Sequence, residues 1–280
     1  MGDNSFLHAS LLAYLCAILA GGIDLAQPGD TTRRVASWSL GAGFLLQAAA
    51  ILLRSGQVGS FAVGSFAEQV AFLTWLVAGI YLAVARRYRL AVLGAIVATI
   101  AFVGALTALV DHGGVRDLPP GLRSPWLPVH VGLAFLGNAA FAFACLVSLI
   151  YLWQERKLKA YSLDPRMRGL PSLETLDQAN YRCITWGFVM LTLSILSGVL
   201  WAELSFGRLW SWEPRTVWTA VIWMLYAGLL HGRVTVGWGG RRAARVAARR
   251  SRAGGSPARE SAAAAEGDRK STRLNSSHRT

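Results

Sequence analysis

The sequence predicts an all-α integral membrane protein, a polytopic helical bundle with seven spans. Of its 280 residues, 54% are hydrophobic and only 15% are charged, whereas soluble domains carry about 25% charged residues. Seven apolar runs are each long enough to cross a bilayer core of about 30 Å, which takes about 20 helical residues. The runs are continuous rather than alternating between apolar and polar residues, which excludes membrane β-strands.

The expected spans follow one another with only one long connection. They cover residues 6–25, 35–53, 66–85, 90–110, 129–153, 183–204 and 216–232. No basic residue precedes the first run, and only Asp3 gives that segment charge. We therefore expect the first run to be a retained helix rather than a cleaved signal peptide. With its loops, the membrane domain occupies residues 1–240.

The distribution of Lys and Arg predicts the orientation of the bundle, because basic residues stay on the cytoplasmic side. Of the 28 Lys and Arg residues, 23 lie on one side, in the segments 26–34, 86–89, 154–182 and after residue 232. The other five are Arg54, Arg116, Arg123, Arg208 and Arg215. We expect the N-terminus outside and the C-terminus in the cytoplasm. The outer loops are then 54–65, 111–128 and 205–215.

Two polar segments lie on the expected inner side. Within the long connection 154–182, the stretch Ser172-Leu-Glu-Thr-Leu-Asp predicts a short helix with a polar start. An amphipathic connector at the membrane surface would have the same pattern.

The second segment, residues 241–280, is a basic low-complexity tail of Arg, Ala, Gly and Ser that cannot pack a core. One interpretation is a genuine disordered tail. The other is frame-shifted, GC-rich sequence ending in Arg269–His278, RKSTRLNSSH, which is typical of sequencing-adapter read-through. We expect no fold from this segment in either case.

Charge and cysteine content exclude several classes of protein. The net charge of +13 suggests nucleic acid at first, but the cations form short clusters between apolar runs instead of a basic face on a polar domain. The three cysteines, Cys16, Cys145 and Cys183, form no CxxC or CxxCH motif. The pattern therefore indicates no disulfide framework, zinc ribbon or covalently attached c-type haem.

The stretch 201–223 on the expected outer face is the most informative part of the chain. It contains five of the eleven tryptophans: Trp201, Trp210, Trp212, Trp218 and Trp223. An aromatic belt at the lipid interface is one interpretation. A belt, however, has no need of Gly207 or Pro214, which shape a fixed loop. A preformed aromatic surface for a flat apolar ligand is the interpretation that we favour.

Two histidines lie at the ends of expected spans. His130 begins the fifth span, on the same outer side as the tryptophans, and His231 ends the seventh span near the inner face. A lone histidine in such a place is often structural. Ionisable residues in a span are nonetheless functional candidates, and a neutral imidazole is a common axial ligand of haem iron.

At this point the chain resembles a known family. The tryptophan-rich stretch resembles the "WWD" signature of haem-handling proteins, and residues 60–243 are similar to the CcsA/ResC branch of cytochrome c biogenesis proteins. The motifs that carry the resemblance occur in order: Ser124-Pro-Trp-Leu-Pro-Val-His130-Val, Tyr151-Leu-Trp-Gln-Glu-Arg-Lys-Leu-Lys159, Leu170-Pro-Ser-Leu-Glu-Thr-Leu-Asp, Tyr181-Arg, Gly187-Phe, Leu191-Thr-Leu, Gly207-Arg-Leu-Trp-Ser-Trp-Glu-Pro and Leu230-His-Gly-Arg233.

The resemblance implies a multi-pass protein of the bacterial cytoplasmic (inner) membrane, part of a cytochrome c haem-lyase complex. Such proteins carry haem b across the membrane and present it to apocytochrome c, together with a ResB/CcsB-type membrane partner. It implies His130 and His231 as axial iron ligands. The haem-binding surface would comprise Trp201, Phe206, Trp210, Trp212, Glu213 and Trp218. Arg208 and Arg215 would pair with haem propionates, or else be solvated loop charges.

The chain departs from the family pattern at several positions. Phe206 replaces the first Trp of the signature, Glu213 replaces its Asp, and Thr216 stands where an acidic residue is expected. Family members also continue into an eighth span with a second external histidine, which the tail after residue 240 replaces here. The resemblance thus implies a C-terminally truncated member.

Two other functions remain open. A HemX-like membrane regulator of tetrapyrrole metabolism would have a similar aromatic loop without ligating haem. A permease for another substrate would have internal repeats and helices broken at the midplane, and no convincing repeat is visible.

Overall fold

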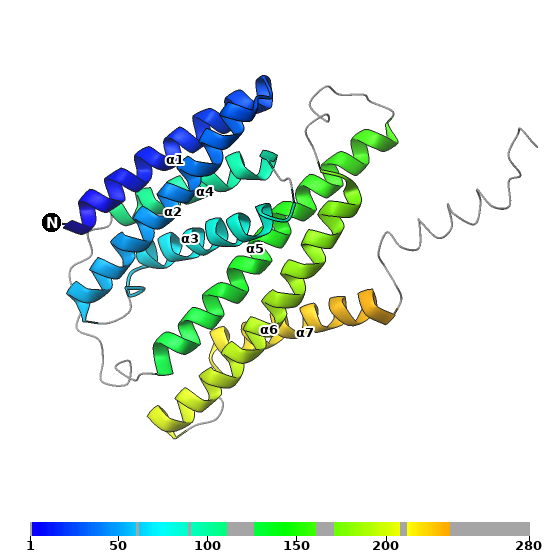
Figure 1. Cartoon of the computed structure of the whole chain (residues 1–280). Helices are drawn as coiled ribbons and strands as arrows, with labels where there is room; N and C mark the ends of the chain where they lie inside the picture. Colours follow the sequence, from blue (N-terminus) through cyan, green and yellow to red (C-terminus); the bar gives the residue numbers. More distant parts are fainter. Residues whose placement is uncertain are drawn as a thin grey trace, which may run out of the picture. The chain divides into compact units, whose positions relative to one another are not determined.

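The computed structural model describes residues 2–59, 62–88, 91–110, 126–160, 171–207 and 212–235, and the regular structure in these ranges is entirely helical (Figure 1). The helices are α1 (Gly2–Ala26), α2 (Asp30–Val58), α3 (Phe66–Ala85), α4 (Ala91–Val110), α5 (Trp126–Lys159), α6 (Leu173–Phe206) and α7 (Pro214–Thr235). All seven are long and apolar enough to cross a membrane. The predicted fold, a polytopic helical membrane protein, is confirmed.

Several helices extend beyond the apolar runs that predicted them. The helix α6 has 34 residues and begins directly after Ser172, whose side chain accepts a hydrogen bond from the Thr175 backbone N–H. The helix with a polar start that was predicted at Ser172 is therefore present, and it continues into the sixth span as one helix. Hydropathy marks the part of a helix that lies in lipid, whereas capping marks its end.

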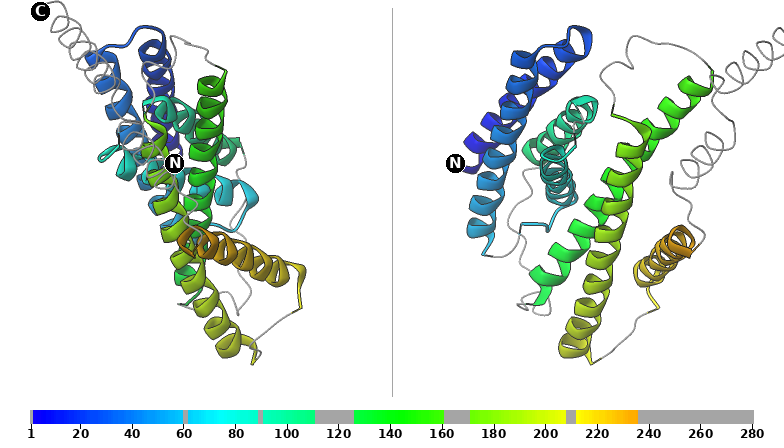
Figure 2. Two further views of the ribbon diagram at one scale, coloured as in Figure 1. Left: turned by 90° about the vertical axis from the view of Figure 1, so that its right-hand side faces the viewer. Right: turned by 45° about the vertical axis from the view of Figure 1, so that its right-hand side comes forward.

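Helices that are neighbours in sequence form the closest pairs. α1 packs along α2, α5 packs along α6, and α3 contacts both α4 and α5 (Figure 2). Small residues permit the close approach of α5 and α6: a Cβ on Gly137 would lie 3.1 Å from the Gly187 carbonyl oxygen. This is the usual way in which membrane helices pack. The largest fully buried side chains include Tyr14, Phe143 and Leu93.

The chain divides into two compact units. The first, residues 1–230, contains α1 to α6 and most of α7. The second begins at His231, and only His231–Thr235 of it lies among the described residues. The predicted tail 241–280 lies outside the described residues.

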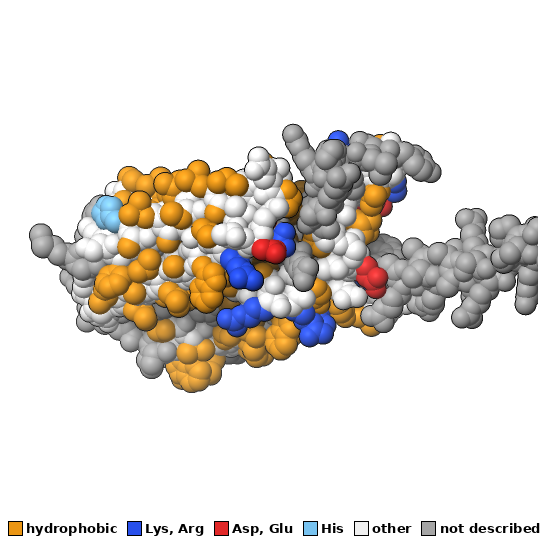
Figure 3. Space-filling model, turned by 45° about the horizontal axis from the view of Figure 1, so that its top comes forward, with side chains coloured by type: hydrophobic (Ala, Val, Ile, Leu, Met, Phe, Trp, Pro, Cys, Tyr) orange, Lys and Arg blue, Asp and Glu red, His pale blue; other side chains and the backbone are white. Residues whose placement is uncertain are grey.

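The surface of the first unit is apolar where a soluble protein would be polar. Large apolar side chains are exposed on several helices, including Trp38, Leu52 and Met224. Figure 3 shows such side chains spread over one face, with Lys and Arg side chains gathered toward one end. An apolar surface of this kind is stable against lipid and not against water.

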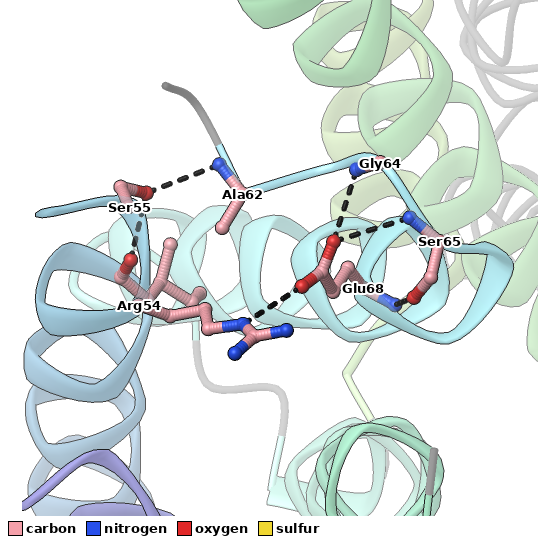
Figure 4. Close-up of polar contacts among 7 residues, drawn as sticks. Arg54, Ser55, Ala62, Gly64, Ser65 and Glu68 are labelled. Carbon is pink, nitrogen blue, oxygen red and sulfur yellow. Dashed lines mark hydrogen bonds and ion pairs between the residues drawn. The ribbon is translucent and has the colours of Figure 1, made fainter. Parts of the chain in front are cut away.

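The connection between α2 and α3 is held by a cluster of polar contacts (Figure 4). Glu68 accepts hydrogen bonds from the backbone N–H groups of Gly64 and Ser65 and pairs with Arg54 Nε at 3.0 Å. Ser65 Oγ accepts from the Glu68 N–H, which completes a capping box. Ser55 Oγ also accepts from the Ala62 N–H at 3.1 Å. The cluster fixes where α3 begins.

Candidate functional site

His130 lies near the start of α5, in the helix that begins at Trp126. Pro128 stands in the first turn, where its missing N–H removes no helical hydrogen bond. The imidazole is half-buried and lies against α6 rather than against its own helix. This contact between the two longest helices forms the centre of the candidate site.

The imidazole is tied to α6 through one nitrogen. His130 Nδ1 lies 2.8 Å from the backbone carbonyl oxygen of Ser194. A carbonyl oxygen only accepts hydrogen bonds, so Nδ1 carries the hydrogen and Nε2 of the neutral ring keeps its lone pair. Ser194 Oγ in turn donates to the His130 carbonyl at 3.3 Å. The Ser194 carbonyl also accepts from Ser197 Oγ at 2.9 Å.

Two further residues of α6 border the same imidazole. Gly198 lies directly against the ring: a Cβ there would be 2.6 Å from His130 Cε1 and 2.7 Å from Nδ1. The Trp201 ring stacks beside it, with centroids 6.3 Å apart and planes 15° apart. Ser194, Gly198 and Trp201 follow a spacing of four and then three residues, which places them on one face of the helix.

The structure thus brings together two predicted site residues, His130 and Trp201. It also adds Ser194 and Gly198, which the sequence interpretation missed. The spacing of two small residues and a tryptophan along one helical face was the available signal. That signal alone does not reveal which neighbour the face contacts.

The tryptophan-rich stretch begins in the last turns of α6, which ends at Phe206. Gly207 follows with φ 61°, the left-handed conformation that ends a helix and favours glycine. Trp212 and Trp218 expose 84% and 65% of their surface, and Glu213 is also exposed. Arg208 and Trp210 lie outside the described residues, as do the side chains of Phe206 and Arg215.

Aromatic side chains attach the helix α7 to its neighbours. Trp223 Nε1 donates to Thr192 Oγ1 on α6 at 3.0 Å, and its ring stacks on Phe188. The Tyr226 ring stacks on Phe141 of α5 with centroids 3.7 Å apart. These contacts hold the middle of α7 against α5 and α6.

His231 lies in the last turns of α7 and is exposed. Its backbone carbonyl accepts a hydrogen bond from Thr235 Oγ1 at 2.6 Å. Across the described ranges, no group of three or more His, Cys, Asp or Glu side chains is placed to hold a metal ion.

Comparison with known proteins agrees with the resemblance seen in the motifs. The model of the family described as "Cytochrome C assembly protein" matches residues 63–249, which include α3 to α7 and the residues around His130. The chain belongs to this family. Its role is therefore in cytochrome c biogenesis, a process that involves haem handling.

Three similar proteins carry the name "Cytochrome c biogenesis protein CcsA". The protein of Synechococcus sp. (strain CC9902) is 35% identical over 229 residues, 72% of this chain and 75% of that protein. The protein of Guillardia theta is 34% identical over 211 residues, 68% of this chain and 69% of that protein. That of Synechococcus sp. (strain RCC307) is 32% identical over 276 residues, 88% of each chain.

Proposed function

We propose that this chain binds haem b, delivers it across the bacterial cytoplasmic membrane and presents it on the outer face to apocytochrome c. When bound, haem supplies the vinyl groups to which the cysteine thiols of the apocytochrome add. The work of this chain is to bind, orient and expose that ligand. A membrane partner of the ResB/CcsB type is part of the proposal.

The observation that carries the proposal is the state of His130. A histidine that ligates iron through Nε2 needs that nitrogen unprotonated and the ring held in a fixed orientation. In the neutral ring, the hydrogen bond from Nδ1 to the Ser194 carbonyl leaves Nε2 without a hydrogen, and the contacts with Gly198 and Trp201 support a fixed orientation of the ring. The donor set of this site fits an axial haem ligand.

The remaining predicted residues have supporting roles in the proposal. Trp201, Trp212 and Trp218 offer flat apolar surface, and burial of apolar surface is worth about 25 cal/mol per Å². His231 would be the ligand near the inner face. Phe206 and Trp210 would extend the aromatic surface, and Glu213 would be part of the loop that holds the haem. Arg208 and Arg215 would pair with propionates. The distribution of Lys and Arg supports an outer location for His130.

The test compares two histidine variants of the full chain, purified from membranes in detergent. His130→Ala removes the proposed ligand. The matched control is His8→Ala, because His8 is exposed on α1 and its Nδ1 lies 2.6 Å from the Asn4 carbonyl of its own helix. We expect His130→Ala to lower the haem bound per protein at least about tenfold and His8→Ala to leave it unchanged. Added imidazole should restore part of the loss.

A second readout distinguishes haem delivery from regulation. In cells that express the chain with a ResB/CcsB-type partner, c-type cytochromes are measured by haem staining. The proposal would be contradicted if both single variants, His130→Ala and His231→Ala, kept their haem content and still supported cytochrome maturation. That result would favour a membrane regulator that does not ligate haem.

A further inference from the structure

We infer that α6 provides a seat for the His130 imidazole, made of the Ser194 carbonyl and the bare backbone of Gly198, and that Gly198 is a positioning residue for haem ligation. The inference rests on the proposed function. It concerns residues that lie outside the tryptophan-rich stretch and that would contact haem only through His130.

The first part of the argument is the shape of the seat. The position that a Gly198 Cβ would occupy is 2.6 Å from His130 Cε1 and 2.7 Å from Nδ1, closer than unbonded carbon and nitrogen atoms approach. Glycine is the one residue that leaves this space for the ring. Any side chain at position 198 would displace the imidazole and stretch its hydrogen bond to Ser194.

The second part of the argument concerns which atoms would have to move if a methyl group were added. The atoms that a Cβ would meet at Gly198 belong to a side chain, which turns away without movement of either helix. At Gly137, in contrast, a Cβ would meet the backbone of α6, 3.1 Å from both the Gly187 carbonyl oxygen and the Leu191 nitrogen. A methyl group at Gly198 should therefore disturb the histidine, whereas a methyl group at Gly137 should disturb the helix packing.

The third part is the tautomer. In the seat, the Ser194 carbonyl accepts the hydrogen of His130 Nδ1 at 2.8 Å, and Ser194 is 2% exposed, so water does not compete for this oxygen. Partners of this kind orient a ligating imidazole and raise its basicity, and their loss typically weakens metal binding about 10- to 100-fold. Displacing the ring should have an effect of this size.

The experiment uses glycine-to-alanine variants of the full chain. Gly198→Ala is compared with Gly132→Ala, a control on α5 close to His130 where a Cβ meets nothing within 4 Å. Haem affinity is measured by titration of the detergent-purified protein, and axial ligation by the absorption spectrum of the bound haem. We expect about 10-fold weaker binding and an altered spectrum for Gly198→Ala, wild-type behaviour for Gly132→Ala, and partial recovery of Gly198→Ala with imidazole.

Gly137→Ala and a double variant separate positioning from packing. Gly137→Ala should lower the temperature of unfolding with little effect on the spectrum. In His130→Ala, the space beside Gly198 is already empty, so Gly198→Ala should add no further loss of haem or of yield. This comparison remains decisive if Gly198→Ala alone accumulates poorly, because the double variant should then accumulate like His130→Ala.

The failures of the two proposals differ. If His130→Ala loses haem but Gly198→Ala keeps the wild-type affinity and spectrum, the seat is wrong and haem binding stands. An equal loss in Gly132→Ala, or an added loss in the double variant, would also overturn the seat. If His130→Ala itself retains all its haem, the proposed function fails. The role of Gly198 in haem ligation then fails as well, because His130 is not a haem ligand.

Discussion

At the scale of single residues, one buried polar side chain connects neighbouring helices. Gln47 is fully buried and connects three helices. It accepts a hydrogen bond from Tyr14 Oη at 2.8 Å and donates to the Ala71 carbonyl at 3.1 Å. Inside a bilayer, neither group would have water as an alternative partner. These two hydrogen bonds therefore fix how α1, α2 and α3 are rotated about their axes.

We expect Gln47→Leu to destabilise the fold by about 1–3 kcal/mol, because it leaves the Tyr14 hydroxyl buried without its acceptor. Removing both partners in Tyr14→Phe/Gln47→Leu should recover part of this loss, since no orphaned donor remains. The measurement is unfolding in detergent followed by circular dichroism. A double variant less stable than the sum of the two single variants would contradict the assignment.

At the scale of elements, the ends of the helices depend on polar contacts that hydropathy does not report. Glu68 accepts from two backbone N–H groups and pairs with Arg54. Both charged side chains are mostly buried, so the pair is less screened than one at a surface. Ser172 and Gly207 delimit α6 by the same kind of local chemistry.

Glu68→Ala should cost about 0.5–2 kcal/mol, the range for the loss of a helix cap. Glu68→Gln keeps an oxygen that can accept from the backbone and loses only the charge, so it should cost less. Hydrogen exchange at the start of α3 measures the effect locally. Glu174→Ala is the control, because Glu174 is also acidic and in a first turn but is exposed. Equal exchange in Glu68→Ala and wild type would show that the cluster does not fix the helix start.

At the scale of the whole molecule, the basic residues predict which loops face the cytoplasm. The loop between α1 and α2 precedes Arg33 and Arg34, whereas the connection between α2 and α3 contains only neutral residues after Arg54. Asp24, which is buried at the end of α1, pairs with Arg33 and accepts from the Gly29 N–H. The first of these loops is thus a compact structure next to a basic helix start.

The orientation can be measured with single cysteines in a chain whose three native cysteines are replaced. Gln57→Cys lies on the expected outer side and Gln27→Cys on the inner side, and both positions are exposed. A membrane-impermeant thiol reagent should label Gln57→Cys in intact cells and Gln27→Cys only after permeabilisation. The reverse pattern would invert the topology and place His130 on the cytoplasmic face.

The class of the fold, the number of described spans and the family could all be predicted from the sequence, because each depends on local composition or on the order of motifs. Apolar length predicts a span from its own transfer free energy, whatever its neighbours are. The sequence also singled out His130 and Trp201, although it did not show that they stack. Their roles as haem-site residues stay predictions.

Only the tertiary structure decided which residues surround His130. The contact with Ser194 joins positions 64 residues apart, and it depends on the depth and rotation of α5 against α6. The absence of a side chain brings the backbones of the two helices together at Gly137, makes room for the Phe141 ring at Gly187, and leaves space for the imidazole at Gly198. A glycine in an apolar run looks the same in the sequence whether it faces lipid or another side chain. Its role depends on which atoms pack against it, and these come from a distant part of the chain.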